Sequence, residues 1–169
     1  INRLRQDKKF FQKKDILTLG TLFPFLNRRE ASKLNREGVL TNIEKKDFSK
    51  HLFQNILGAN ICHSLDVSDY QQSEIITNLN FPIPDELKGN YDVIYDAGTL
   101  EHISDLTTGI RNIFSLLKND GIYYFGVPCN NWIDHGFFQF SPTFFIDLCG
   151  CNKNLELETI FLSTKDSYF

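Results

Sequence analysis

The 169-residue chain has the length of one domain, and 41% of its residues are hydrophobic, which is enough to bury a sizeable core. Its net charge of −3, from 18 basic and 21 acidic residues, is too small to indicate a nucleic acid or a charged membrane surface as its partner. We therefore expect one domain over residues 1–169 that binds neither.

The cysteines and the ends of the chain indicate in which cellular compartment we expect the protein. The four cysteines are not spaced as pairs, and the spacing of Cys62, His63, Cys129 and His135 matches no standard zinc finger. We therefore expect no metal, and reduced thiols suit the cytoplasm. The chain has neither a signal-peptide pattern nor an apolar run of about 18 residues. It also lacks an initial Met, as a fragment of a longer chain would.

The first part of the chain mixes one clear strand with irregular segments. Residues 1–14 are a charged lead-in without a pattern, and residues 16–20 read as a short buried strand that ends in glycine. An irregular stretch follows over residues 21–46, with a short helix expected near 29–35. Asp47 then caps a helix with an apolar face, and Gly58 ends it.

Three further strand patterns follow that helix. They cover residues 61–65, which lead into Asp66, residues 74–79 and residues 91–96. Only residues 67–73 separate the first two of these strands. A parallel crossover usually takes about a dozen residues or more. If both strands belong to one parallel sheet, the helix between them is missing or reduced to a turn.

The remainder of the chain continues the alternation. A helix begins at Ser104 or Asp105, and a turn over residues 119–121 leads into a buried strand over 122–127. Ser141 and Pro142 start a helix that ends at Gly150. Residues 155–162 alternate apolar and charged side chains as an edge strand does. The alternation of strands and helices predicts an α/β fold with a mostly parallel sheet.

In a parallel sheet the loops that follow Gly20, Asp66, Leu79 and Asp96 share one edge, where ligands of such folds bind. Asp66 is placed there either to accept hydrogen bonds from a ribose diol or to stabilise a turn. The first of these loops keeps a single glycine of the GxGxxG pattern that cradles a dinucleotide pyrophosphate. This departure disfavours a nicotinamide or flavin cofactor.

Five segments in order resemble the class I S-adenosylmethionine-dependent methyltransferases over about residues 15–162. They are ILTLG, LDVSDY, IITNLN, YDVIYDAGTLEHI and LLKNDGIYYFGVP. The tail NNWIDHGFFQFSPTFF is similar to a bacterial subgroup with an HGFyqfSP stretch. The resemblance implies a Rossmann-like three-layer α/β/α sandwich, the cofactor S-adenosyl-L-methionine and methyl transfer to the O or N atom of a small molecule such as a sugar or another metabolite.

The resemblance also implies site residues. Gly20 matches the glycine beside the methionine part of the cofactor, and Asp66 matches the acid that holds the ribose hydroxyls. Asn78 and Leu79 match the loop that contacts adenine, where the family often has Asp. Asp96 and Gly98 would lie beneath the amino-acid end of the cofactor, which completes the cofactor set: Gly20, Asp66, Asn78, Leu79, Asp96 and Gly98.

Glu101, His102 and His135 are the candidate catalytic residues on the acceptor side. An imidazole titrates near neutral pH and can take a proton from the acceptor. The alternatives are structural: His102 fixes the strand-to-helix turn, His135 bonds within its loop, and Glu101 orients the cofactor amine or caps a helix. An aromatic run forms either an acceptor wall or core packing: Trp132, Phe137, Phe138, Phe140, Phe144 and Phe145.

Two rival functions remain open on the sequence. The glycine-poor first loop also fits a binding or structural protein that keeps the methyltransferase fold without turnover. A nicotinamide-dependent oxidoreductase is the other rival, and the missing glycines disfavour it. The sequence gives no indication of the oligomeric state.

Overall fold

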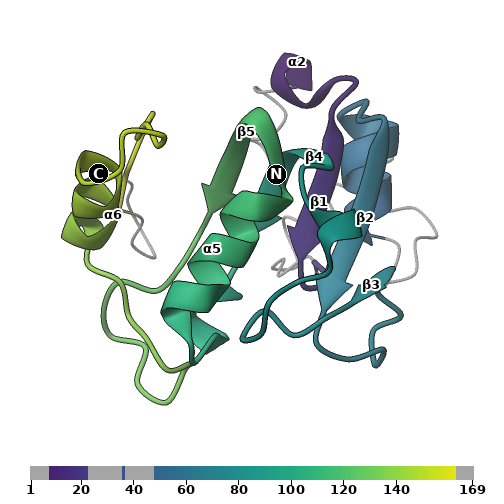
Figure 1. The fold of residues 1–169 in the computed structure, drawn as a ribbon. Coiled ribbons are helices and arrows are strands. Elements are labelled where there is room, and N and C mark those ends of the chain that lie inside the picture. Colours follow the sequence, from purple (N-terminus) through teal and green to yellow (C-terminus); the bar gives the residue numbers. More distant parts are fainter. Residues whose placement is uncertain (1–7, 23–35, 37–47, 163–169) are drawn as a thin grey trace.

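The computed structural model describes residues 8–22, 36 and 48–162 of the chain. Five parallel strands form one sheet in the order β3-β2-β1-β4-β5, and helices pack on both of its faces (Figure 1). The strands are β1 (Asp15–Leu19), β2 (Ile61–Asp66), β3 (Ile75–Ile76), β4 (Tyr91–Asp96) and β5 (Leu117–Phe125). The predicted Rossmann-like α/β fold with a parallel sheet is therefore confirmed.

The helices of the described residues differ in length and type. They are α2 (Lys8–Phe11), α4 (Phe48–Lys50), the π-helical η2 (His51–Ile56), the 3₁₀ turns η3 (Asp85–Leu87) and η4 (Leu100–His102), α5 (Leu106–Leu116) and α6 (Pro142–Gly150). Ser141 caps α6 through the Thr143 amide, as predicted, and of the two expected starts of α5, Ser104 and Asp105, it is Asp105 that caps the helix through the Thr108 amide. Within the described ranges, no helix combines the length and apolarity that a membrane span requires.

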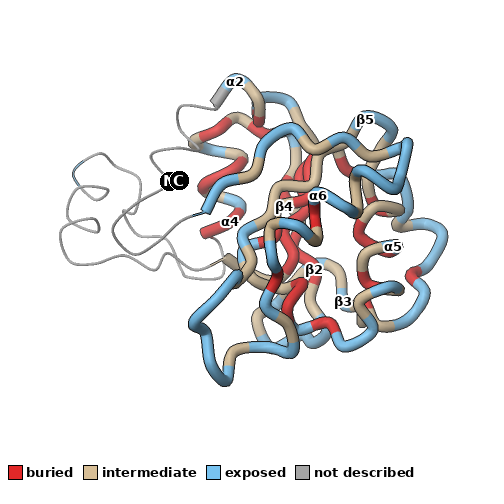
Figure 2. Tube along the Cα trace, turned by 90° about the vertical axis from the view of Figure 1, so that its left-hand side faces the viewer, coloured by how far each residue is buried: buried red, intermediate tan, exposed pale blue. Residues whose placement is uncertain are grey.

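Successive residues of β1 point to opposite faces of the sheet and so create two cores. Leu17 packs into the larger core with residues of α5, such as Ile113. Ile16 packs into the other core with Phe53 of η2. In Figure 2 the strands form a buried centre with exposed segments around it. The two cores give the three-layer arrangement that the resemblance implies.

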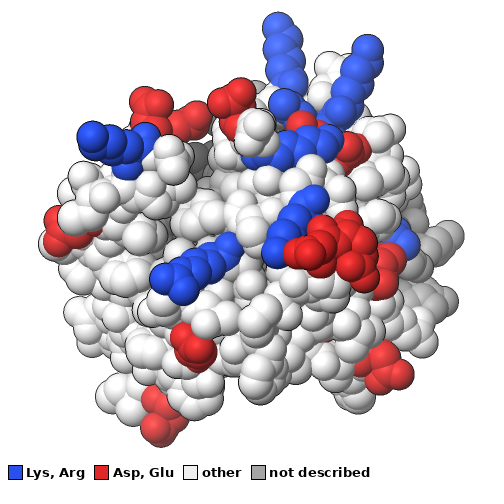
Figure 3. Space-filling model, in the orientation of Figure 1, with Lys and Arg blue, Asp and Glu red and all other residues white. Residues whose placement is uncertain are grey.

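The charged surface in Figure 3 has no broad area of one sign, because Lys and Arg lie among Asp and Glu. At the amino end of the sheet, Lys118 Nζ lies 2.6 Å from Asp15 Oδ2 and 3.1 Å from Asp92 Oδ2. These charges lie near the starts of β1 and β4, opposite the edge where the strands end.

The prediction of a strand over residues 74–79 is wrong in length, since β3 has only two residues. The Glu74 side chain accepts a hydrogen bond from the Ser64 amide, at 2.8 Å, where a longer third strand would pair with β2. After β3, the Asn78 side chain accepts a hydrogen bond from the Asn80 amide, and the chain turns away from β2. Residues 67–74 contain no helix, as the short spacing indicated.

The expected turn over residues 119–121 is instead an irregularity inside β5, which also begins earlier and ends earlier than predicted. Tyr91 pairs with Leu117 and Val93 pairs with Ile122, so a step of two residues along β4 corresponds to a step of five residues along β5. Asp120 has a φ of 61° within this bulge. The backbone does deviate at residues 119–121, but β5 pairs with β4 on both sides of the deviation.

The predicted edge strand over residues 155–162 is wrong, since these residues form no strand. The Leu155 amide bonds to the Asn152 carbonyl in a turn, and Ile160 packs against the larger core. The alternation therefore reflects partial packing of a loop. The prediction of a helix near residues 29–35 lies outside the described residues, as does Asp47. Lys8–Phe11 of the expected lead-in form the short helix α2.

Candidate functional site

The carboxyl ends of β1 and β4 border a hollow of about 250 Å³. The lining comes from residues 19–22 at the end of β1, from residues 97–99 after β4, and from Gln71. From β1, the sheet continues through β2 to β3 on one side. On the other side it continues through β4 to β5. The strand order therefore reverses its direction between β1 and β4. Open α/β sheets bind their ligands at this topological switch point.

Gly20 and Asp66 lie at neighbouring strand ends of this edge. The Gly20 amide donates to the Leu65 carbonyl at 2.8 Å, so the turn after β1 rests on β2. The Asp66 carboxylate accepts a hydrogen bond from the Ser68 amide at 3.2 Å. This bond supports the turn interpretation of Asp66. A carboxylate has about four lone-pair sites, however, so the side chain keeps acceptor capacity for a ligand.

Asn78 and Leu79 form an internally bonded loop. The Asn78 Oδ1 atom accepts hydrogen bonds from the backbone amide and the side-chain amide of Asn80, at 3.0 and 2.9 Å. Leu79 is buried in the larger core, and its carbonyl accepts a hydrogen bond from the Asn112 side chain at 2.9 Å. Neither residue lines the hollow at the ends of β1 and β4.

Asp96 is buried and holds the turn after β4. Its carboxylate accepts hydrogen bonds from the amides of Gly98, Thr99 and Leu100 and from the Tyr123 hydroxyl. Burial raises the pKa of Asp96 above its usual value despite these bonds. The side chain thus shapes the loop that borders the hollow.

Glu101 lies on η4 with only 1% of its surface exposed. Its Oε1 atom is 3.3 Å from the His135 Nε2 atom, and its Oε2 atom has no hydrogen-bond partner among the described residues. The Glu101 carbonyl accepts hydrogen bonds from the amides of Phe137 and Phe138, at 2.7 and 3.2 Å. Main-chain and side-chain contacts therefore join the loop after β4 to the loop after β5.

Two glycines permit this close approach. Gly136 has a φ of 72°, and a Cβ atom there would lie 2.9 Å from the Glu101 carbonyl oxygen. Gly98 has a φ of 111°, and a Cβ atom there would lie 3.0 Å from Glu101 Oε1. L-residues disfavour such φ values, and Glu101 leaves no space for a side chain at either position. Both positions therefore require glycine. Gly98 also lines the hollow, whereas Glu101 itself does not.

His102 and His135 come together beside Glu101. Their ring centroids are 5.0 Å apart, and Trp132 packs on His135 at 4.6 Å. One ligand atom from each of Glu101, His102 and His135 can be chosen so that all three lie within 4.8 Å of one another. The sequence indicated that the two loops share an edge. It gave no signal that the three side chains form one cluster or that the carboxylate is buried.

The aromatic run divides into two parts. Phe140 and Phe145 are buried in the larger core, and Phe138 and Phe144 pack against it. Trp132 and Phe137 are 56% and 69% exposed. Core packing therefore accounts for the later residues, and only the earlier part of the run is open to an acceptor.

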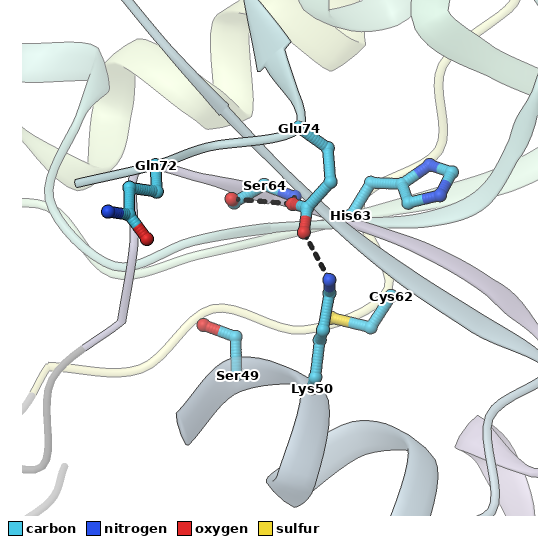
Figure 4. A pocket seen from close by; sticks show the side chains of 7 residues that line it. All are labelled: Ser49, Lys50, Cys62, His63, Ser64, Gln72 and Glu74. Atoms are coloured by element: carbon cyan, nitrogen blue, oxygen red, sulfur yellow. Dashed lines mark hydrogen bonds and ion pairs between the residues drawn. The ribbon is translucent and has the colours of Figure 1, made fainter. Parts of the chain in front are cut away.

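A second hollow, of about 200 Å³, lies between α4 and β2 (Figure 4). Glu74 projects into it, forms an ion pair with Lys50 and accepts hydrogen bonds from Ser64. Burial raises the pKa of Glu74, but these bonds outweigh it and lower the pKa to about 2. Burial also raises the pKa of the Cys62 thiol to about 12, so this cysteine is a poor nucleophile.

No protein-family profile and no curated protein sequence matches the chain. The structure is similar to an S-adenosylmethionine-dependent methyltransferase from Mesorhizobium loti, with 17% identity and a TM-score of 0.43, over 73% of this chain and 50% of the other. It is also similar to a putative zinc-dependent alcohol dehydrogenase from Rhodobacter sphaeroides, with 11% identity and a TM-score of 0.47, over 75% of this chain and 47% of the other.

A third similar structure is the trans-methyltransferase CalH in complex with SAH, with 15% identity and a TM-score of 0.43, over 73% of this chain and 34% of the other. The matched region thus spans half or less of each of these proteins.

Proposed function

We propose that the protein is an S-adenosyl-L-methionine-dependent methyltransferase that methylates an O or N atom of a small molecule, such as a sugar or another metabolite. The observation that carries this proposal is the hollow at the ends of β1 and β4, with Asp66 at the end of the adjacent β2. The bacterial subgroup with an HGFyqfSP stretch and a cytoplasmic location belong to the same proposal.

The residues around the hollow fit this cofactor. Asp66 keeps acceptor capacity for the two ribose hydroxyls, and the backbone at Gly20 and Gly98 would face the methionine part. The described residues that line the hollow include no Lys or Arg. That lining suits a positively charged sulfonium better than a pyrophosphate, which prefers basic groups and clustered amides. When bound, the cofactor supplies an electrophilic methyl group on its sulfonium.

We propose that the acceptor binds at the cluster of Glu101, His102 and His135. These residues do not line the hollow, but Gly98, which does, packs against Glu101. A free imidazole nitrogen accepts a proton from a hydroxyl or amine that approaches it. The contact with Glu101 fixes the His135 ring, and the packed Trp132 ring limits its rotation. Because more than half of the Trp132 side chain is exposed, it offers a flat apolar surface to an acceptor.

The second candidate is a protein that binds the cofactor or a related nucleoside without turnover. The glycine-poor loop after β1 favours it, because Gly20 is the single glycine that this loop contributes to the hollow, and a cofactor that is held less closely there is less readily aligned for transfer. In this candidate the carboxyl edge of the sheet still binds the cofactor or nucleoside, but no acceptor is methylated.

Release of S-adenosylhomocysteine separates the two candidates. The full-length protein is incubated with S-adenosylmethionine and a panel of small hydroxyl and amine acceptors. The proposal predicts acceptor-dependent release that falls at least tenfold in Asp66→Ala and persists in the control Asp69→Ala. Binding of the cofactor without release for any acceptor would favour the second candidate, and the absence of both binding and release would contradict both.

A further inference from the structure

We propose that Glu101, His102 and His135 form a binding site for a divalent transition-metal ion of the zinc type. Two imidazoles and one carboxylate would hold the ion and leave a coordination position open to solvent. This site goes beyond the proposed methyl transfer and does not depend on it, because it is defined by side chains of the loops after β4 and β5.

Two of the three ligand atoms already have the spacing of coordinated ligands. His135 Nε2 and Glu101 Oε1 are 3.3 Å apart. In a tetrahedral site with bonds of about 2.1 Å, neighbouring ligand atoms are separated by about 3.4 Å. All three ligand atoms lie within 4.8 Å of one another. His102 is exposed, so its side chain can rotate to close the remaining distance without disturbing the core.

The Glu101 carboxylate supplies a second, independent observation. Its side chain is 1% exposed, yet Oε2 has no partner among the described residues. An unsatisfied buried oxygen costs about 1–3 kcal/mol, and more when it is charged. Such a group requires an explanation, and a bound ion is one of the ordinary ones. A divalent cation that is held by both oxygens of the Glu101 carboxylate and by the two imidazoles would satisfy Oε2 and balance the charge of the carboxylate.

The surroundings hold Glu101 and His135 in place before any ion binds. The Phe137 and Phe138 amides bond to the Glu101 carbonyl, and Gly136 lies against it, so the loop that carries His135 is fixed on η4. Trp132 packs against the His135 ring on the other side. Supporting contacts of this kind orient metal ligands and raise the affinity of metal sites.

The donor set selects the class of ion. Two imidazole nitrogens and one carboxylate oxygen suit Zn²⁺, Co²⁺ or Fe²⁺, whereas Mg²⁺ and Ca²⁺ prefer sites built from oxygen alone. Three protein ligands leave room for a water molecule or a ligand oxygen. Coordination and proton acceptance use the same imidazole lone pairs. The metal content of the protein therefore decides whether these histidines act as bases or as ligands.

Titration of the metal-stripped full-length protein with Co²⁺, in the absence of S-adenosylmethionine, tests the site. We expect one ion per chain, visible absorption bands without thiolate charge transfer, and affinity at least tenfold lower in His102→Ala, His135→Ala and Glu101→Gln. His51→Ala and His63→Ala use the other two histidines of the chain as controls and should bind normally. His102→Ala changes an exposed residue, so its fold should survive, and circular dichroism checks this.

Three results would overturn the site: no binding by the folded wild-type protein, unchanged affinity in both His102→Ala and His135→Ala, or a thiolate charge-transfer band that accompanies binding. The last would place the ion on cysteine. Because the cofactor is absent from the titration, failure of the metal site leaves the methyltransferase proposal untouched, and the reverse also holds.

Discussion

The Nε2 atom of His135 lies 3.3 Å from the Oε1 atom of Glu101, although the two residues belong to loops that follow different strands. The contact joins the segments that follow β4 and β5. It makes a buried carboxylate the centre of a polar cluster whose two histidines remain accessible.

Gly136→Ala should break this contact. The substitution puts a Cβ atom 2.9 Å from the Glu101 carbonyl oxygen at a φ of 72°. Strain of this kind costs about 1–3 kcal/mol, so the urea midpoint should fall and the loop should move away from η4. The His135 imidazole resonances, followed by NMR, should shift as the ring leaves Glu101.

Gly89→Ala is the matched control, because Gly89 has a similar φ of 67° but no atom within 4 Å of its Cβ position. Gly89→Ala should lower the urea midpoint less than Gly136→Ala does, and it should leave the His135 resonances unshifted. Equal losses of stability in both variants, with unshifted resonances, would show that the contact with Glu101 does not constrain Gly136.

Glu74 should make the fold sensitive to acid. Because its pKa is lowered from 4.5 to about 2, its stabilising effect is complete above pH 4.5 and is lost as the pH falls from there toward 2. Glu74→Gln should therefore have a lower urea midpoint than the wild type at pH 6, and the difference should shrink by pH 3. Glu156→Gln, at an exposed position, should give no such convergence. A constant difference from pH 6 to pH 3 would contradict the assignment.

Asn112 should be essential for the loop after β3. Its side-chain amide donates to the carbonyls of Leu79 and Phe81, at 2.9 and 2.8 Å, from a buried position on α5. Asn112→Ala should lower the free energy of unfolding by about 2 kcal/mol, since the buried bond at the Leu79 carbonyl and the partly buried bond at the Phe81 carbonyl lose their donor. Ser115→Ala, on the same helix, should cost less than about 1 kcal/mol in the same denaturation measurement. Similar costs for the two variants would argue against this role of Asn112.

The sequence was most informative where local and tertiary signals agree. The bounds of β4 were predicted as observed, since its side chains are buried on both faces and the Ala97-Gly98 turn ends the strand. The cap of α6, Ser141, was identified, and the cap of α5 was narrowed to Ser104 or Asp105, of which the structure has Asp105, because a cap depends on a few adjacent residues.

The sequence was least informative where a side chain replaces main-chain pairing or where distant loops meet. Glu74 bonds to the Ser64 amide in place of a third-strand residue, and nothing in the local pattern indicates this. The burial of Glu101 depends on the approach of Gly136, which comes from a loop much later in the chain. Periodicity describes an element and its faces, but it does not report which loops pack on one another.

Calorimetric titration of the full-length protein with S-adenosylhomocysteine tests the central claim most directly, because it requires no knowledge of the acceptor. The account predicts binding of one molecule per chain with micromolar affinity, lost in Asp66→Ala and retained in Asp69→Ala, whose side chain lies in the same loop. If the folded wild-type protein binds neither S-adenosylhomocysteine nor S-adenosylmethionine, or if Asp66→Ala binds as tightly as the wild type, the proposed cofactor site at the ends of β1, β2 and β4 is contradicted.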